Sequence, residues 1–196
     1  MPDGAVTVWF DYACPHSYHG LRQLEELAQA IGFEIDRRPF LVRTAPVEAG
    51  PLPSDSRHAA NDTRRQPLYQ PGHGLGTEPA SNRSVSTLAV HAATAYAKEQ
   101  GLDRGFYWAA SKEYWEQGTD LGNLYTIRRL ALITGLDWGE MWPKLESGSY
   151  HSLVLAQHEA ALKAGVVRTP SFQVGGRLHA GPIDADQLRA AVQASG

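Results

Sequence analysis

The chain has 196 residues, of which 42% are hydrophobic and 20% are charged. These values lie near the averages for globular proteins, so they exclude a disordered or fibrous chain and allow one domain, or one domain with a large insertion. The formal net charge of -3 offers no broad attraction for nucleic acid, and no apolar run approaches the roughly 20 residues that cross a bilayer. We therefore expect neither nucleic acid nor a membrane as a partner.

The first residues, Met-Pro-Asp-Gly-Ala, lack a basic segment followed by an apolar core, and the apolar run at 6–10 is too short for a signal segment. The chain contains a single cysteine, Cys14, which cannot form an internal disulfide. A lone cysteine is compatible with a reducing compartment. The sequence thus predicts a cytoplasmic protein with one thiol whose role has to be explained.

The apolar run at 6–10 predicts a buried strand, and the residues from Tyr18 to Ile31 have the three- and four-residue spacing of an amphipathic helix that ends at Gly32. Between them lies the pair Cys14-Pro15. Proline is tolerated in the first helical turn, so this pair predicts that Cys14 stands at the helix N-terminus. The amide groups and the dipole of a helix favour an anion there, and we expect a nucleophilic thiolate.

Two neighbours of Cys14 are candidates for assisting it. His16, when protonated, adds a second positive charge, and the Ser17 hydroxyl one turn on is placed to hydrogen-bond the thiolate. Simpler interpretations stay open: a buried inert thiol, a solvated histidine at the helix start and an ordinary serine of the first turn. We expect no metal, because His16 and His19 point away from Cys14 on a helix of about 3.6 residues per turn.

Asp11, which precedes this turn, also has two interpretations. An ionised carboxylate close to a thiol opposes its ionisation. We favour the other interpretation, in which Asp11 accepts hydrogen bonds from backbone amides at the end of the strand.

The rest of the chain divides into segments of different character. Residues 33–41 suit a second strand, near a sheet edge because of Pro39. Residues 44–81 contain many prolines and glycines and predict a long loop or lid. From 82 to 164 the pattern is helical throughout, and the cluster of aromatic residues within it is predicted to form a core: Phe106, Tyr107, Trp108, Tyr114 and Trp115.

The final segment returns to strand. Residues 169–174 are extended, Gly175-Gly176 is typical of a two-residue hairpin turn, and residues 177–180 pair back. Asp184 then caps a closing helix. The order strand, helix, strand, helical insert, hairpin and helix predicts an α/β protein.

Two motifs carry a resemblance to a known family. The strand that leads into Cys14-Pro15-x-x at a helix start, together with Thr169-Pro170-Ser171-Phe172 before a late hairpin, resembles the thioredoxin fold, and the helical block between them resembles its DsbA-type branch. Within that branch the chain is similar to the FrnE-like group in four stretches: Asp11-Tyr12-Ala13-Cys14-Pro15, Glu113-Tyr114-Trp115, Gly118-Thr119-Asp120 and residues 164–172. The match extends over essentially the whole chain.

The resemblance implies an α/β, thioredoxin-like fold with a large all-helical insertion. Residues 1–43 plus 165–196 would form the thioredoxin-like domain, and 44–164 the lid loop and insertion. It also implies that Pro170 is cis and lies against the active-site helix, and that a bound thiol partner is held beside Pro15, Thr169 and Pro170. The extended chain of that partner would pair with the backbone at Thr169, and the groove between Cys14, Pro170 and the insert would select the substrate.

One departure from the family pattern decides the chemistry. DsbA-like oxidants carry Cys-Pro-His-Cys, whereas this chain reads Cys14-Pro15-His16-Ser17. A dithiol oxidant stores two electrons in an internal disulfide, which a single cysteine cannot form. We therefore expect a monothiol oxidoreductase in which Cys14 forms a mixed disulfide with glutathione or with a protein or small thiol. Glutathione would be a co-substrate, and no tightly bound cofactor is expected.

Two alternatives remain. The kappa-class glutathione transferases and 2-hydroxychromene-2-carboxylate isomerases carry a similar Asp-x-x-Ser-Pro-x-Ser pattern. Asp11, Pro15 and Ser17 match this pattern, while Cys14 replaces its catalytic serine. The other alternative is a non-catalytic binding module that keeps the fold.

Overall fold

A computed structural model describes residues 5–43 and 86–194, so the predicted lid at 44–81 lies outside the described residues. The chain divides into two compact units: unit 1 is Met1–Val42 with Leu155–Gly196, and unit 2 is Arg43–Val154. The second boundary falls within helix α7 (Ser149–Lys163), whereas the sequence suggested a division after residue 164. Within the described ranges, no helix is long and apolar enough to cross a membrane.

Unit 1 is built on a four-stranded sheet in the order β2-β1-β3-β4. Strand β1 (Val6–Phe10) pairs in parallel with β2 (Ile35–Pro39) and antiparallel with β3 (Ser171–Val174), which forms a hairpin with β4 (Arg177–Ala180). The strand that contains proline lies at an edge, as predicted. Both residues of the hairpin turn, Gly175 and Gly176, have positive φ, which a type I′ turn requires.

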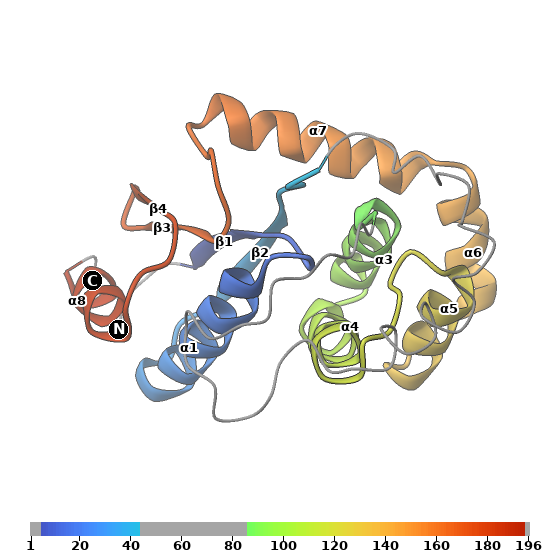
Figure 1. Cartoon of the computed structure of the whole chain (residues 1–196), viewed down its shortest axis with the longest axis horizontal. Helices are drawn as coiled ribbons and strands as arrows, with labels where there is room; N and C mark the ends of the chain where they lie inside the picture. Colours follow the sequence, from blue (N-terminus) through green and yellow to red (C-terminus); the bar gives the residue numbers. More distant parts are fainter. Residues whose placement is uncertain (1–4, 44–85, 195–196) are drawn as a thin grey trace, which may run out of the picture. The chain divides into compact units, whose positions relative to one another are not determined.

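Alternate side chains of the sheet face opposite layers. Val8 lies opposite Phe172 in the register, and the Phe172 ring points at Gly20 of α1 (Pro15–Ile31). Helix α8 (Ala185–Gln193) packs against α1, as the blue and red helices of Figure 1 show. Trp9 follows Val8 in β1, so its side chain lies on the opposite face of the sheet, where it packs in a buried cluster with Phe40, Ala161 and Val166.

Helix α1 buries one face, as its spacing predicts. Leu21 and Leu24 are fully buried. On the same helix Glu25 forms an ion pair with Arg37 of β2, and both side chains are buried. The helix ends at Gly32 in the left-handed conformation, with the Gly32 amide donating to a carbonyl of the last turn. The helix that carries the cysteine is therefore fixed to the sheet by packing and by a buried charge pair.

Unit 2 contains α3 (Leu88–Glu99), α4 (Asp103–Gln117), α5 (Leu124–Ile133), α6 (Trp138–Glu146) and the start of α7 (Figure 1). The predicted aromatic core is confirmed on α4, where Phe106, Tyr107, Tyr114 and Trp115 are buried and Trp108 is half-buried. A mixed sheet interrupted by a helical block is the α/β architecture with an all-helical insertion that the sequence predicts.

Candidate active site

Cys14 occupies the position that its sequence context predicts. It is the N-cap residue of α1, with an extended backbone (φ -96°, ψ 114°), and Pro15 follows as the first helical residue. The Cys14 carbonyl accepts the amides of Ser17 at 3.1 Å and Tyr18 at 3.3 Å. The thiol is therefore carried by the residue that opens the helix, at the end where unpaired amides and the helix dipole favour an anion.

The loop before β3 supplies the other half of the site. The Thr169–Pro170 peptide bond is cis, as the resemblance implied. The Cys14 thiol donates to the Thr169 carbonyl, with 3.4 Å between Sγ and the oxygen. The Pro170 carbonyl in turn accepts the Gly181 amide at 2.9 Å, which fixes the loop to the end of β4. The structure thus brings Cys14, which Pro15 follows in the chain, to the loop of Thr169 and Pro170, although the sequence separates the two segments widely.

Gly20 allows this approach, and the sequence analysis missed it. A Cβ atom on Gly20 would lie 3.1 Å from Phe172 Cζ and 3.2 Å from Pro170 Cγ. These distances are shorter than ordinary carbon–carbon contacts of about 3.5–4.0 Å. A glycine within an amphipathic helix indicates at most that something approaches closely. It does not indicate that the neighbour is the loop contacting the thiol.

The two predicted assisting residues are close to Cys14 in the chain, and their roles remain predictions. His16 is half-buried, and its Nδ1 atom has neither solvent contact nor a hydrogen-bond partner in the described part of the chain. Ser17 is 1% exposed, and its hydroxyl oxygen accepts the Asp11 amide at 3.4 Å. The hydroxyl oxygen therefore bonds to the loop that precedes Cys14.

Asp11 accepts backbone amides, as the favoured interpretation states. Its Oδ1 accepts the Ala13 amide at 3.1 Å and its Oδ2 accepts the Val42 amide at 2.7 Å. The side chain is almost fully buried, with the residue 2% exposed. The bond to Ala13 is local and could be anticipated from the turn, whereas the bond to Val42 joins segments that no sequence pattern connects.

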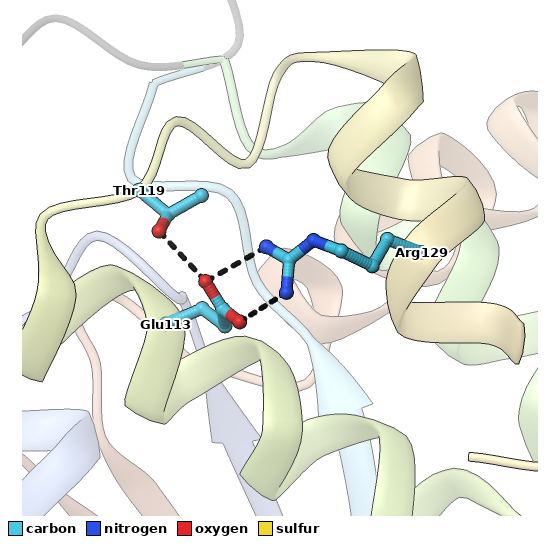
Figure 2. Close-up of polar contacts among 3 residues, drawn as sticks. All are labelled: Glu113, Thr119 and Arg129. Atoms are coloured by element: carbon cyan, nitrogen blue, oxygen red, sulfur yellow. Dashed lines mark hydrogen bonds and ion pairs between the residues drawn. The ribbon is translucent and has the colours of Figure 1, made fainter. Parts of the chain in front are cut away.

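A second polar cluster lies in unit 2 and includes Glu113 and Thr119 (Figure 2). The Glu113 carboxylate accepts two hydrogen bonds from the Arg129 guanidinium, at 2.5 and 2.9 Å, and one from the Thr119 hydroxyl at 2.8 Å. The bonds from Arg129 lower the pKa of Glu113, although desolvation of the carboxylate opposes this shift. The cluster ties the end of α4 to α5, so these residues brace the insert.

The described residues show no metal centre. Across 5–43 and 86–194, no group of three or more His, Cys, Asp or Glu side chains is arranged to hold a metal ion.

A strand leading to a cysteine at a helix start, next to a cis-proline loop, defines a thioredoxin-like thiol site. The chain matches the family described as DSBA-like thioredoxin domain over residues 5–193, and it belongs to this family. Among curated proteins it is similar to the uncharacterized protein YwbO of Bacillus subtilis (strain 168), with 23% identity covering 95% of this chain and 94% of that protein.

Solved structures share the fold over nearly the whole chain. A probable DsbA oxidoreductase from Streptomyces coelicolor has a TM-score of 0.74 and 21% identity, covering 97% of this chain and 89% of that one. A 2-hydroxychromene-2-carboxylate isomerase has a TM-score of 0.68 and 20% identity, with coverages of 97% and 94%. The cytosolic disulfide reductase DsbM from Pseudomonas aeruginosa, solved with GSH, has a TM-score of 0.61 and 15% identity, with coverages of 98% and 95%. The fold is thus that of a group containing both thiol oxidoreductases and isomerases.

Proposed function

We propose that the protein is a cytoplasmic monothiol thiol–disulfide oxidoreductase that acts through Cys14 with glutathione as co-substrate. The observation that carries this proposal is the position of the thiol. Cys14 opens α1, and its Sγ lies 3.4 Å from the Thr169 carbonyl beside a cis-proline. Cys14 is buried, with 9% of the residue exposed, so the helix start and the adjacent loop, which a structural thiol does not need, are the features that favour a reactive thiol.

In the first step the Cys14 thiolate attacks the disulfide of a glutathionylated thiol, R–S–S–G. A bond forms between Cys14 Sγ and the glutathione sulfur, the S–S bond of R–S–S–G breaks, and R–S⁻ leaves and takes a proton from water. The thiolate no longer has a proton to donate to Thr169. The Thr169 carbonyl then accepts an amide of the bound partner, whose extended chain pairs with this loop.

The second step requires an external thiol. Ser17 stands where dithiol relatives of the family carry their second cysteine, and a hydroxyl cannot displace a thiolate from a mixed disulfide. A glutathione thiolate therefore attacks the glutathione sulfur of the mixed disulfide, which releases oxidised glutathione and regenerates the Cys14 thiolate. In the net reaction R–S–S–G is reduced to R–SH, and one glutathione is oxidised into the disulfide.

The relative solved with GSH supports the choice of co-substrate and compartment. It is named a cytosolic disulfide reductase, and it shares the fold of this chain. A single thiol without an internal partner also fits a compartment in which glutathione supplies the reducing equivalents.

Glutathione-dependent isomerisation or transfer is the second candidate. It is favoured by the fold shared with a 2-hydroxychromene-2-carboxylate isomerase and by the matches at Asp11, Pro15 and Ser17. In this function Cys14 would polarise bound glutathione and would not react. The C14S variant would then keep or gain activity, whereas it abolishes activity in an oxidoreductase.

The test is the release of a free thiol from a glutathionylated peptide in the presence of reduced glutathione. We expect the wild-type protein to accelerate this release and C14S to lose the acceleration completely. If C14S releases the thiol as fast as wild type, the oxidoreductase proposal is wrong. If C14S instead conjugates glutathione to an electrophile, the second candidate is correct. If neither protein reacts and the thiol alkylates slowly, a binding module is indicated.

A further inference from the structure

Asp11 forms three hydrogen bonds within the loop that carries the thiol. Its amide donates to the Ser17 hydroxyl at 3.4 Å, and its carbonyl accepts the Cys14 amide at 3.1 Å. Its Oδ1 accepts the Ala13 amide at 3.1 Å. The backbone that delivers Cys14 is therefore folded around this one residue.

The second carboxylate oxygen joins this loop to the neighbouring strand. Oδ2 accepts the Val42 amide at 2.7 Å, just beyond the end of β2. The two preceding amides are also bound: Phe40 donates to the Phe10 carbonyl at 2.9 Å, and Leu41 donates to Nδ1 of a buried histidine at 3.2 Å. Val42 is 56% exposed, so the packing of its side chain contributes little to fixing the position of this residue. The bond to Asp11 therefore extends the attachment of β2 to the thiol loop by one residue.

Only a carboxylate satisfies both amides. An ionised aspartate offers two acceptor oxygens, whereas asparagine offers one oxygen and a donor NH₂ group. In a D11N variant one of the two amides, that of Ala13 or that of Val42, would face another donor on a side chain that is almost fully buried. Leaving a buried donor unpaired is costly, so the loop would move to relieve the conflict.

We propose that Asp11 is a positioning residue that sets the place of Cys14 Sγ against the Thr169 carbonyl. It acts through the Ala13, Cys14 and Ser17 groups that it binds. The inference rests on the proposed function, because positioning matters only if the thiol exchanges with a disulfide partner held at Thr169. Disulfide exchange needs sulfur atoms in line and a partner docked beside the loop, whereas alkylation by a small uncharged reagent needs only an accessible thiolate.

The test compares these two reactions in the full chain. Rates of reaction with oxidised glutathione and with iodoacetamide are measured for wild type, D11N and the control E25Q. Glu25 is also a buried carboxylate of unit 1, but its ion pair is with Arg37 of β2 and not with a group of the thiol loop. For D11N we expect the glutathione rate to fall about 10- to 100-fold, as for a misplaced reacting group, and the iodoacetamide rate to change far less. For E25Q we expect both rates to keep their wild-type ratio.

A second variant keeps the test sharp if D11N folds poorly. V42P removes the amide that binds Asp11 Oδ2 and leaves the carboxylate in place. It should lower the ratio of the glutathione rate to the iodoacetamide rate, but by less than D11N does. Amide hydrogen exchange at Ala13 should rise in both variants. The inference is wrong if D11N keeps the wild-type ratio, or if E25Q lowers the ratio equally. If wild type alkylates but does not react with oxidised glutathione, the proposed function itself fails.

Discussion

Replacing Gly20 with alanine perturbs the spacing between α1 and the loop that carries Pro170. The added methyl group would meet Phe172 Cζ at 3.1 Å and Pro170 Cγ at 3.2 Å, so these atoms must shift by a few tenths of an ångström. Overpacking of this kind costs about 1–3 kcal/mol. Alanine regains about 1 kcal/mol of helix propensity, so the net loss of stability is about 0–2 kcal/mol.

Gly105 provides the matched control. It lies in α4, and a Cβ atom there meets nothing within 4 Å. G105A should therefore show only the propensity gain of up to about 1 kcal/mol. The two variants should differ by about 1–3 kcal/mol in the free energy of unfolding, which corresponds to roughly 2–4 °C of Tm for each kcal/mol in a chain of this size.

Thermal unfolding followed by circular dichroism measures the stability difference, and the reaction of Cys14 with oxidised glutathione measures the effect on the site. We expect G20A to slow this reaction, because the loop beside the thiol has moved, and G105A to leave it unchanged. If G20A is stabilised as much as G105A and reacts at the wild-type rate, the close approach of α1 to the cis-proline loop does not position the thiol.

Three further predictions concern charges and burial. E113Q should lose about 1.5–3 kcal/mol of unfolding free energy at pH 7, because it disrupts the charged hydrogen bonds from Arg129. Folding lowers the pKa of Glu113, so the stability that this carboxylate contributes is present above the unfolded value near 4.5 and is lost as the pH falls through the folded value. Unfolding of wild type and E113Q at a series of acidic pH values measures this loss. R37M leaves the Glu25 carboxylate buried without its ion pair and should lower the free energy of unfolding, measured in urea, by about 3–5 kcal/mol. A loss under about 1 kcal/mol would contradict this account of the buried pair. Burial raises the pKa of Tyr150 to about 12, so the absorbance change of this tyrosine should come late in a titration to high pH, and Y150F should remove that late component from the wild-type curve.

Local patterns predicted most of the elements. The strand at 6–10, the helix from Pro15, the hairpin at Gly175-Gly176 and the cap at Asp184 each depend on residues that are neighbours in the chain. Spacing and turn chemistry report such short-range preferences directly. The same is true of Cys14 at the helix start, which follows from one adjacent proline.

Long-range contacts were predicted only where a resemblance supplied them. The contact between Cys14 and Thr169 came from a shared motif, because nothing in the spacing of either segment indicates that they meet. The bond from Asp11 to Val42 and the packing of Gly20 on Pro170 were not predicted. At both positions the neighbouring atoms that require a carboxylate or a glycine are brought there by the fold, and they belong to residues that are distant in the sequence.

The most direct test of the account is intact mass spectrometry after incubation of the native protein with oxidised glutathione. The account predicts one glutathione adduct, located on Cys14, absent from C14S and removed by reduced glutathione. A native protein that stays unmodified, while the same thiol alkylates fully after unfolding, would contradict it.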